Sequence, residues 1–350
     1  MSHATTRMAQ EASETPMRVA DQLNKNASIV AKIADNLKQF DPALIVTCAR
    51  GSSDHAATYV KYLFETRLRL PVASFAPSVS SVYDVTVRLE RAVFVAISQS
   101  GQSPDLLKST EAALTAGAYV IALVNDASSP LAALANDVLP LEMGPETSVA
   151  ATKSCLGSMT AAYQLCAACA ESNVMDDALR ALPEAFFETL NSNWTAAAPA
   201  FTEASQALIV SRGLGFAAAQ EAALKLKETS QLQAEAFSTA EVRHGPMAIV
   251  GPHIPIIAAA TGDAATGSIE DIARHFATLG APVFLASPEE ITGSDMPAGV
   301  RYLPTPHAPE SALQPLVFLL TFYMFANKLA VARGLDPDNP TGLRKVTETV

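Results

Sequence analysis

An internal repeat is the feature of this sequence that most constrains how it can fold. Two pairs of glycines in similar segments mark the repeat: Gly51 with Gly213, and Gly117 with Gly280. The first pair is 213 − 51 = 162 residues apart, and the second pair is 280 − 117 = 163 residues apart. Because the two markers agree on nearly the same offset, the sequence predicts two tandem copies of one structural unit.

Short continuous apolar runs recur in both copies, with helical segments between them. The expected strands cover residues 43–48, 92–97 and 118–124 in the first copy, and residues 207–211, 254–260 and the run ending at Ser287 in the second. Runs of this kind are typical of strands buried on both faces of a parallel sheet. The predicted fold class is therefore α/β, with two tandem domains that each consist of a parallel sheet flanked by helices.

The length and composition of the chain agree with two domains. The sequence has 350 residues and is 49% hydrophobic, which is enough apolar material for two cores. We expect a helical leader over residues 1–35, a first domain over 36–175 and a linker over 176–197. A second domain is expected over residues 198–341, followed by a C-terminal tail over 342–350.

Charge and cysteine usage narrow the cellular setting and the class of partner. The formal net charge is −11, from 24 basic and 35 acidic residues without a Lys/Arg cluster, so nucleic acid is not an expected partner. The N-terminus lacks a signal-peptide pattern, and polar residues interrupt the apolar stretch 315–332, so no membrane association is expected. Scattered cysteines and histidines predict a cytoplasmic protein without a metal or other cofactor.

A serine-rich turn, "SQSGQSP" over residues 98–104, follows one of the expected strands. Ser103 is a good helix N-cap, and Pro104 suits the first helical position. Hydroxyls, backbone N–H groups and a helix dipole would make a phosphate cradle there without any lysine. A second turn, Arg50 to Ser53, favours this interpretation, and a capped turn that binds nothing is the alternative.

A charged stripe and a histidine are candidates for catalysis. The segment "QEAALKLKETSQLQAEAF", interpreted as one helix, carries residues at offsets of 4, 7 and 14 on one face: Glu221, Lys225, Glu228 and Glu235. His244 lies nearby, before a rigid Gly-Pro turn. In aldose–ketose chemistry a carboxylate can move the proton between C1 and C2, and an imidazole can open the ring. The alternatives are a solvated stripe and a histidine held by structural hydrogen bonds.

The irregular C-terminal tail, "DPDNPTGLRKVTETV", carries Lys345 close to its end. Tails of this kind are usually frayed and inert. A lysine that folds back into a site differs, because its neutral amine can add to a sugar carbonyl and form an imine. Both possibilities stay open from the residues alone.

Five motifs together resemble the isomerase part of glucosamine-6-phosphate synthase. In order along the chain they are "SQSGQSPDLL", "SVAATKS", "EAALKLKETSQLQAEAF", "EVRHGPMAIV" and "LRKVTETV". The match runs from about Asp35 to the end of the sequence. The resemblance implies two tandem sugar-isomerase (SIS) domains, each a nucleotide-fold-like three-layer sandwich, and a homodimer with shared active sites.

The resemblance also implies roles for individual residues. Those implied to hold the phosphate of a hexose or hexosamine 6-phosphate are Ser52, Ser53, Ser98, Gln99, Ser100 and Ser103, whereas Glu146 and Val149 would line the sugar. Glu228 is implied as the proton-transfer base, supported by Lys225. His244 would open the ring from the neighbouring subunit, and Lys345 would form the imine. All of these groups must reach one hexose.

Departures from the family pattern favour one reaction. Ser2 follows Met1 where the synthase has its glutamine-hydrolysing cysteine, and no upstream glutaminase domain is expected. The chain is similar to the second type of glucosamine-6-phosphate deaminase, which implies conversion of glucosamine 6-phosphate and water to fructose 6-phosphate and ammonia. Ala151 replaces a usual serine, and "CARGSS" replaces "CGTS", which bears on sugar selectivity.

Two other functions stay open. A synthase-like isomerase or aminotransferase could use free ammonia, or act on a related sugar such as galactosamine 6-phosphate or a fructosamine phosphate. A non-catalytic sugar-phosphate sensor could use the same fold. Sensors can discard Glu228, His244 and Lys345, and this chain has all three.

Overall fold

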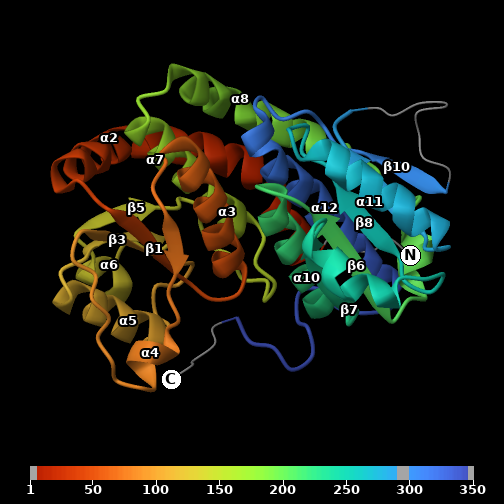
Figure 1. Ribbon diagram of the computed structural model, residues 1–350, viewed down its shortest axis with the longest axis horizontal. Coiled ribbons are helices and arrows are strands. Elements are labelled where there is room, and N and C mark those ends of the chain that lie inside the picture. Colours follow the sequence, from red (N-terminus) through yellow and green to blue (C-terminus); the bar gives the residue numbers. More distant parts are fainter. Residues whose placement is uncertain (1–5, 290–298, 346–350) are drawn as a thin grey trace. The chain divides into compact units, whose positions relative to one another are not determined.

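The computed structural model describes residues 6–289 and 299–345, which form two compact units with one parallel sheet each (Figure 1). The β1–β5 unit contains the described residues 15–146, 153–183 and 344–345. The β6–β10 unit contains the described residues 6–14, 147–152, 184–289 and 299–343. The predicted α/β fold with two parallel sheets is thereby confirmed.

Strands and helices alternate in the β1–β5 unit. Its strands are β1 (Leu44–Cys48), β2 (Val72–Ser74), β3 (Ala92–Ser98), β4 (Tyr119–Val124) and β5 (Asp137–Pro140). Its helices are α2 (Thr15–Phe40), α3 (Ser52–Arg67), α4 (Ser78–Ser81), α5 (Pro104–Thr115), α6 (Pro130–Leu134), α7 (Lys153–Cys169) and the first part of α8 (Asn173–Thr189). All strand pairs are parallel, in the order β2-β1-β3-β4-β5.

Helices cover both faces of this sheet, as the alternation of side chains along its strands shows. Val46 and Phe94 pack in one cluster with residues of α5 and α6. Ile45 and Val93, one position away, line a pocket together with residues of α2, α3 and α7. Because successive side chains of a strand point to opposite faces, the sheet lies between these two helix layers.

The β6–β10 unit repeats the same plan. Its strands are β6 (Gln206–Ser211), β7 (Gln233–Ser238), β8 (Ile256–Ala259), β9 (Val283–Ser287) and β10 (Val300–Pro304). Its helices are α1 (Arg7–Ser13), α9 (Ala198–Thr202), α10 (Gly215–Ser230), α11 (Thr266–Thr278) and α12 (Gln314–Ala332). Short 3₁₀ turns are η1 (Glu241–His244), η2 (Pro246–Ile249) and η4 (Ser311–Leu313).

The internal repeat is confirmed by strand order and by backbone conformation. Read from β7, the second sheet has the order β7-β6-β8-β9-β10, so in both units the first strand lies between the second and the third. The paired glycines also match: φ is 56° at Gly51 and 62° at Gly213, and 84° at Gly117 and 85° at Gly280. Positive φ favours glycine, which explains why these positions mark the repeat.

The apolar runs in the sequence predicted the central strands, whereas no such run indicated the edge strands. The central strands β3, β8 and β9 are buried at every residue, and all six expected runs are strands. The edge strands β2, β5, β7 and β10 are partly exposed along their length, so they lack a continuous apolar run. Of the residues predicted as a linker, 176–189 lie in α8.

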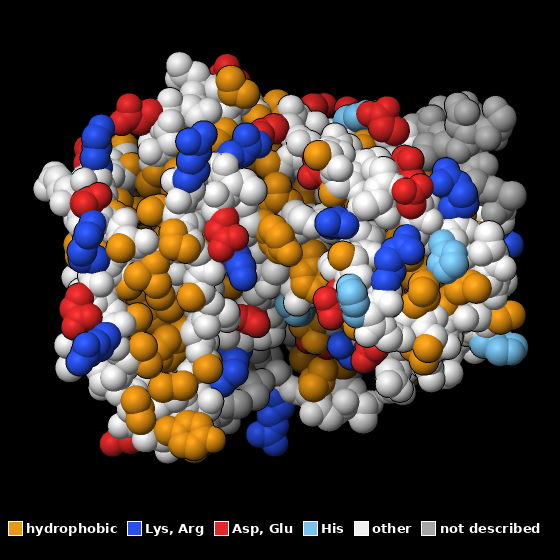
Figure 2. Space-filling model, viewed as in Figure 1, with side chains coloured by type: hydrophobic (Ala, Val, Ile, Leu, Met, Phe, Trp, Pro, Cys, Tyr) orange, Lys and Arg blue, Asp and Glu red, His pale blue; other side chains and the backbone are white. Residues whose placement is uncertain are grey.

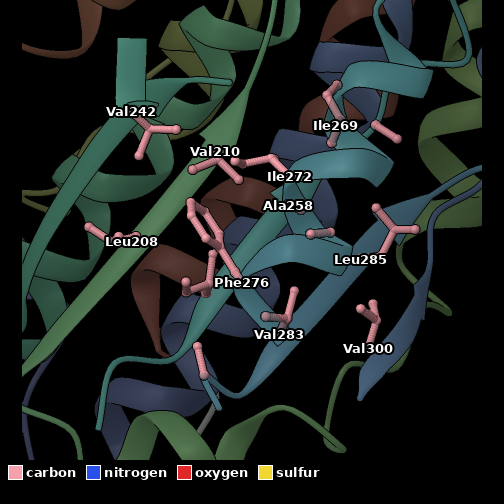
Figure 3. Packing of buried hydrophobic residues seen from close by; sticks show 14 of the residues in the cluster. Leu208, Val210, Val242, Ala258, Ile269, Ile272, Phe276, Val283, Leu285 and Val300 are labelled. Atoms are coloured by element: carbon pink, nitrogen blue, oxygen red, sulfur yellow. The ribbon is translucent and has the colours of Figure 1, made fainter. Parts of the chain in front are cut away.

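Residues of four strands and one helix form the core cluster on one face of the β6–β10 sheet (Figure 3). Val210 of β6, Ala258 of β8 and Leu285 of β9 are fully buried there. Ile272 and Phe276 of α11 lie over the same side of the sheet. This packing fixes the turns that follow the strands, because each turn begins where a buried strand ends.

One helix of the described ranges, extended by η4 to residues 311–332, is long and apolar enough for a membrane span by composition. However, 78% of its most apolar window is buried. Trp194 packs against Phe318, Phe322 and Phe325 of α12, with ring centroids 5.7, 6.3 and 5.9 Å apart. These contacts are those of a core helix.

Charges of both signs are interspersed on the face shown in Figure 2. Exposed pairs one helical turn apart include Arg180 with Asp177 and Arg274 with Asp271. Such pairs contribute about 0–1 kcal/mol each to stability. This face therefore presents a surface of mixed charge.

The core cluster predicts the effect of truncating Phe276, which is 0% exposed. Phe276→Ala should lower the free energy of unfolding by about 3–5 kcal/mol, because buried apolar area is lost and a cavity remains. Leu279→Ala, at a residue that is 40% exposed, is the matched control and should change it by less than about 0.5 kcal/mol. Urea denaturation followed by circular dichroism measures both, and equal shifts would contradict the assigned core.

Candidate active site

The two polar turns of the β1–β5 unit lie at neighbouring strand ends. β1 and β3 pair in parallel, with Cys48 opposite Ala96, so their carboxyl ends meet at one edge of the sheet. At β1 the strand order reverses, since β2 lies on one side and β3 on the other. Open α/β sheets bind ligands outside the carboxyl ends of strands at such a switch point. Residues 50–53 and 98–103 occupy this position.

The serine-rich turn is shaped by two of its own hydroxyl groups. The Gly101 N–H donates to Ser98 Oγ at 3.0 Å, and the Gln102 N–H donates to Ser100 Oγ at 3.3 Å. Ser98 is buried, whereas Gln99, Ser100 and Ser103 are partly exposed. Ser98 therefore stabilises the turn from its buried side, and the side chains of Gln99, Ser100 and Ser103 are accessible to a ligand.

The start of α5 agrees with the prediction in position and differs from it in detail. Pro104 is the first helical residue, and Ser103 occupies the N-cap. However, the Ser103 hydroxyl makes no capping hydrogen bond, contrary to the expectation from its residue type. The Ser103 hydroxyl thus accepts no hydrogen bond from the N–H groups in the first turn of α5. This arrangement suits an anion that accepts from both.

Ser52 and Ser53 begin α3 directly after Gly51, which has φ 56° and provides no side-chain cap. Both serines are partly exposed. The Ser52 carbonyl accepts a hydrogen bond from the Cys155 thiol of α7 at 3.4 Å. The start of α7 therefore lies against the start of α3.

The structure brings together two further predicted residues, Glu146 and Lys345. Lys345 Nζ lies 3.0 Å from Glu146 Oε2, and the Glu146 side chain is fully buried. Glu146 also accepts from the Ser154 N–H at 3.1 Å and from the Ser154 hydroxyl at 2.6 Å. Because Ser154 precedes Cys155, the Glu146–Lys345 pair and Ser52 are joined through one turn of α7. The tail folds back at Lys345 rather than fraying there.

Three charged side chains of α10 form a buried cluster in the β6–β10 unit. Lys225 and Glu221 are 0% exposed, with Lys225 Nζ 3.4 Å from Glu221 Oε1. Lys225 Nζ also donates to Glu228, whose side chain is 20% exposed. The Tyr323 hydroxyl of α12 donates to Glu221 at 3.1 Å. Glu228 is thus the one carboxylate of this cluster that a small molecule can reach.

The interpretation of Glu235 as part of the same helical stripe is wrong. α10 ends at Ser230, and Gln231 takes a left-handed conformation with φ 50°. Glu235 lies in β7, where it is exposed. Glu221, Lys225 and Glu228 share the helix face as predicted, but the polar segment after Ser230 has no apolar run that would have indicated a strand.

His244 ends the 3₁₀ turn η1 and is exposed. Gly245 follows with φ 138° and connects η1 to η2. Within the described chain the imidazole has no hydrogen-bond partner, so the alternative of a histidine held by structural hydrogen bonds does not describe it. An exposed imidazole before a rigid turn is available to a ligand.

Val149 lies in a loop of the β6–β10 unit that other segments hold firmly. Its N–H donates to the Asp338 carbonyl at 3.3 Å. The preceding N–H groups of Thr147 and Ser148 donate to the buried carboxylate of Glu11, at 2.6 Å and 3.1 Å. A carboxylate that accepts several backbone N–H groups fixes the loop that carries Val149.

The sequence analysis placed Arg50 in the second polar turn but did not predict its ion pair beside the serine-rich turn. The Arg50 side chain binds Asp105 of α5, with Nε and Nη2 at 2.8 and 2.7 Å from Oδ2. The two residues are 55 positions apart, and only the pairing of β1 with β3 brings them together. A contact between residues so far apart in the sequence cannot be predicted from a local motif.

Three cysteines, Cys48, Cys166 and Cys169, form no disulfide, and burial suppresses their reactivity. Burial raises the pKa of the Cys166 thiol to about 12 and that of Cys169 to about 11, and it raises the pKa of Cys48 to about 12. A thiol that stays protonated is a poor nucleophile and metal ligand. Within the described ranges no three His, Cys, Asp or Glu side chains are grouped in a manner that would hold a metal ion.

Fold and site together define a tandem α/β protein with polar turns at strand switch points and a buried charged cluster on the second unit. Two stretches, residues 41–168 and 200–333, match the family model for the SIS domain. The chain belongs to the SIS-domain family.

Known proteins that are similar to this chain carry names that refer to sugar phosphates. Glutamine–fructose-6-phosphate aminotransferase (isomerizing) of Mycolicibacterium smegmatis is 32% identical, over 97% of this chain and 56% of that protein. The chain thus spans about half the length of the curated relatives it matches.

Two solved structures share the fold closely. A Silicibacter pomeroyi protein, provisionally described as a phosphosugar isomerase, is 41% identical with a TM-score of 0.89, covering 95% of this chain and 100% of that one. The C-terminal domain of glucosamine-fructose-6-phosphate aminotransferase from Francisella tularensis is 24% identical with a TM-score of 0.83, covering 97% and 99%. The second likeness shows the fold alone.

The turn geometry predicts that Gly101 cannot be replaced without cost. Its φ is 63°, and an added Cβ would lie 2.6 Å from Ser129 Cβ, a buried residue that caps α6. Gly101→Ala should therefore lower the free energy of unfolding by about 2–4 kcal/mol, from backbone strain and overpacking together. Gly51→Ala, with φ 56° and no atom within 4 Å of the added Cβ, should cost only about 1–2 kcal/mol. Chemical denaturation of both variants measures the difference, and the reverse order would contradict the described turn.

Proposed function

We propose that this protein is a phosphosugar isomerase that acts on a hexosamine 6-phosphate, converting glucosamine 6-phosphate and water to fructose 6-phosphate and ammonia. The observation that carries the proposal is the Glu221–Lys225–Glu228 cluster, in which a fully buried lysine holds one accessible carboxylate. A carboxylate fixed in this way suits proton transfer at a sugar carbon. Membership of the SIS-domain family supports a phosphosugar as the substrate.

The serine-rich turn supports binding of the substrate phosphate. Ser100, Ser103 and Gln99 are accessible beside the N-terminus of α5, with Ser52 and Ser53 at the N-terminus of α3. Hydroxyls and backbone N–H groups at two helix starts can hold a phosphate without a broad basic field. In this proposal they anchor the sugar, and the reaction occurs at its other end.

The chemistry starts from the open-chain aldose with its amino group at C2. Glu228 removes the C2 proton, which gives an enolamine, and the proton returns at C1 to give an imine at C2. Water adds to the C2 imine, and ammonia leaves to give fructose 6-phosphate. Lys225 holds the Glu228 carboxylate through this shuttle. The reaction requires the phosphate-binding and proton-transfer residues to act on one substrate molecule.

Lys345 is proposed to contact the sugar at C1 or C2. Its amine is engaged by Glu146 at 3.0 Å, so imine formation with the sugar requires this ion pair to part first. Glu146 has Ser154 as a second partner and stays hydrogen-bonded when Lys345 leaves. The ion pair therefore keeps the Lys345 side chain ordered. When Lys345 moves to the sugar, the buried Glu146 carboxylate is still hydrogen-bonded to Ser154.

Ring opening is assigned to His244, which is exposed on η1. We include in the proposal a homodimer in which this imidazole acts in the active site of the neighbouring copy. Its exposure and its lack of a hydrogen-bond partner in the described chain support a role toward a second molecule.

A second candidate is a synthase-like isomerase or aminotransferase that forms glucosamine 6-phosphate from fructose 6-phosphate. The name of the curated relative favours it, since that protein is an isomerizing aminotransferase. The isomerisation and the groups that carry it are the same, and the two candidates differ in the source or fate of the nitrogen. Ala151 and the "CARGSS" turn also leave galactosamine 6-phosphate or a fructosamine phosphate as substrates.

The decisive assay adds glucosamine 6-phosphate to the purified protein and measures ammonia and fructose 6-phosphate. We expect both products to form in equal amounts, because release of ammonia completes the reaction after isomerisation. Galactosamine 6-phosphate and a fructosamine phosphate are the comparison substrates. Because one catalyst accelerates both directions of a reaction, synthesis from free ammonia would also appear as ammonia release in this assay. Isomerisation of the sugar phosphate without any release of ammonia would favour the aminotransferase-like candidate. Tight binding of sugar phosphate without turnover in any assay would favour a sensor.

The role of Glu228 predicts a loss of turnover without a loss of binding. Glu228→Gln should lower kcat by about 100- to 10,000-fold, the usual contribution of a positioned base. Inhibition by inorganic phosphate should stay within about twofold of the wild type, since the phosphate contacts are untouched. Glu235→Gln, an exposed glutamate in β7, is the matched control and should leave kcat unchanged. Full turnover by the Glu228 variant would remove this residue from the mechanism.

A further inference from the structure

The serine-rich turn has a charged neighbour that none of its local motifs includes. We propose that Arg50 is a phosphate-binding residue of this site and sets its preference for a dianionic phosphate ester; this rests on the proposed function, which assigns the phosphate to the same turn. Arg50 follows β1, and the turn follows β3, the strand paired with β1. Both therefore lie at the same edge of the sheet.

The position of the guanidinium is fixed by a buried carboxylate at the start of α5. Asp105 is 1% exposed, and its Oδ2 accepts from Arg50 Nε at 2.8 Å and lies 2.7 Å from Nη2. Asp105 is the second residue of α5, directly after Pro104 and two residues after Ser103. The contact therefore holds the guanidinium at the helix start where the phosphate is expected. A pre-positioned arginine loses less side-chain entropy when it binds a ligand.

The remaining donors of Arg50 are available to a ligand. Its side chain is 52% exposed, and within the described residues its Nη1 has no hydrogen-bond partner. Arginine presents its N–H groups as a planar fork that matches phosphate oxygens. Asp54 is a second carboxylate near this arginine, besides Asp105. Burial raises the pKa of Asp54, and the positive charge of Arg50 opposes that rise. The positive charge of the guanidinium thus opposes the repulsion that these acidic groups would exert on a phosphate.

The second unit supplies a natural comparison, because the equivalent of Gly101 there is Asp263, at 263 − 162 = 101. The Asp263 carboxylate accepts from the Thr261 hydroxyl at 2.8 Å and from the Ala265 N–H at 2.9 Å. In the β6–β10 unit the turn thus contains its own anion. In the β1–β5 unit Gly101 leaves this position without a side chain. The turn of the β1–β5 unit carries no acidic side chain at this step, and the guanidinium of Arg50 lies beside it.

Arg212 is the matched control for Arg50, since 212 − 162 = 50 places it at the same step of the repeat. Arg212 is exposed after β6 and forms no ion pair within the described chain. The two variants remove the same charge from equivalent positions. A difference between them therefore reports the site rather than the net charge of the protein.

The experiment measures binding of fructose 6-phosphate and of inorganic phosphate by isothermal titration calorimetry. We expect Arg50→Ala to raise both dissociation constants about tenfold, as for loss of a half-exposed charge-assisted contact. Arg50→Lys should give a smaller loss, because it keeps the charge without the fork. Arg212→Ala should bind as the wild type does. Since Arg50→Ala leaves a buried Asp105 unpaired, the double variant Arg50→Ala/Asp105→Asn is measured beside it, and the same weakening is expected there.

Ser100→Ala/Ser103→Ala separates this inference from the proposed function. If that variant loses phosphate binding while both Arg50 variants bind like the wild type, the role of Arg50 is overturned and the serine site stands. If Arg50→Ala weakens binding and the serine variant does not, the serine assignment fails instead. Equal losses in Arg50→Ala and Arg212→Ala would reduce the effect to net charge and overturn the inference. A wild type that binds neither probe would overturn both proposals.

Discussion

The parallel pairing of the first and third strands in each unit is the constraint on which the rest of the structure depends. It places the turns after β1 and β3, or after β6 and β8, at one sheet edge. Each first-strand turn passes through an Arg-Gly pair whose glycine has positive φ, which starts the following helix at once. Helix N-termini and polar turn residues therefore converge at this edge in each unit, which is where open α/β sheets bind ligands.

Side chains then give the two units different chemistry on the same backbone. The positions of α3 equivalent to Glu221, Lys225 and Glu228 are 221 − 162 = 59, 225 − 162 = 63 and 228 − 162 = 66, which are Tyr59, Leu63 and Thr66. Tyr59 and Leu63 are buried with 0% exposure, as core residues of α3. Conversely, the turn after β8 carries the Asp263 carboxylate, whereas the corresponding step of the turn after β3 is Gly101. The residues proposed to anchor the phosphate thus lie in one unit, and those proposed to transfer the proton lie in the other.

The sequence predicted the parts of the fold whose signal is local and continuous. The buried central strands could be identified because apolar residues run almost unbroken along them, and the repeat because glycines with positive φ recur at nearly one offset. The edge strands were not identified because exposed residues interrupt their apolar pattern. The end of α10 at Ser230 also escaped, since a left-handed Gln231 has no distinctive sequence signal. The Arg50–Asp105 pair arises from strand pairing, so no reading of one segment could have found it.

The α10 cluster cannot be explained by stability alone. Burying an ammonium between two carboxylates costs several kcal/mol of desolvation per ion, which their attraction offsets only in good geometry. In α3 the equivalent positions are occupied by Tyr59, Leu63 and Thr66, and this helix forms without a buried charge. What the charged version adds is an accessible carboxylate whose orientation is fixed by a lysine that water does not reach. An accessible carboxylate needs a fixed orientation only when it acts on a bound molecule. The desolvation cost of the cluster is therefore itself an argument that α10 faces a substrate.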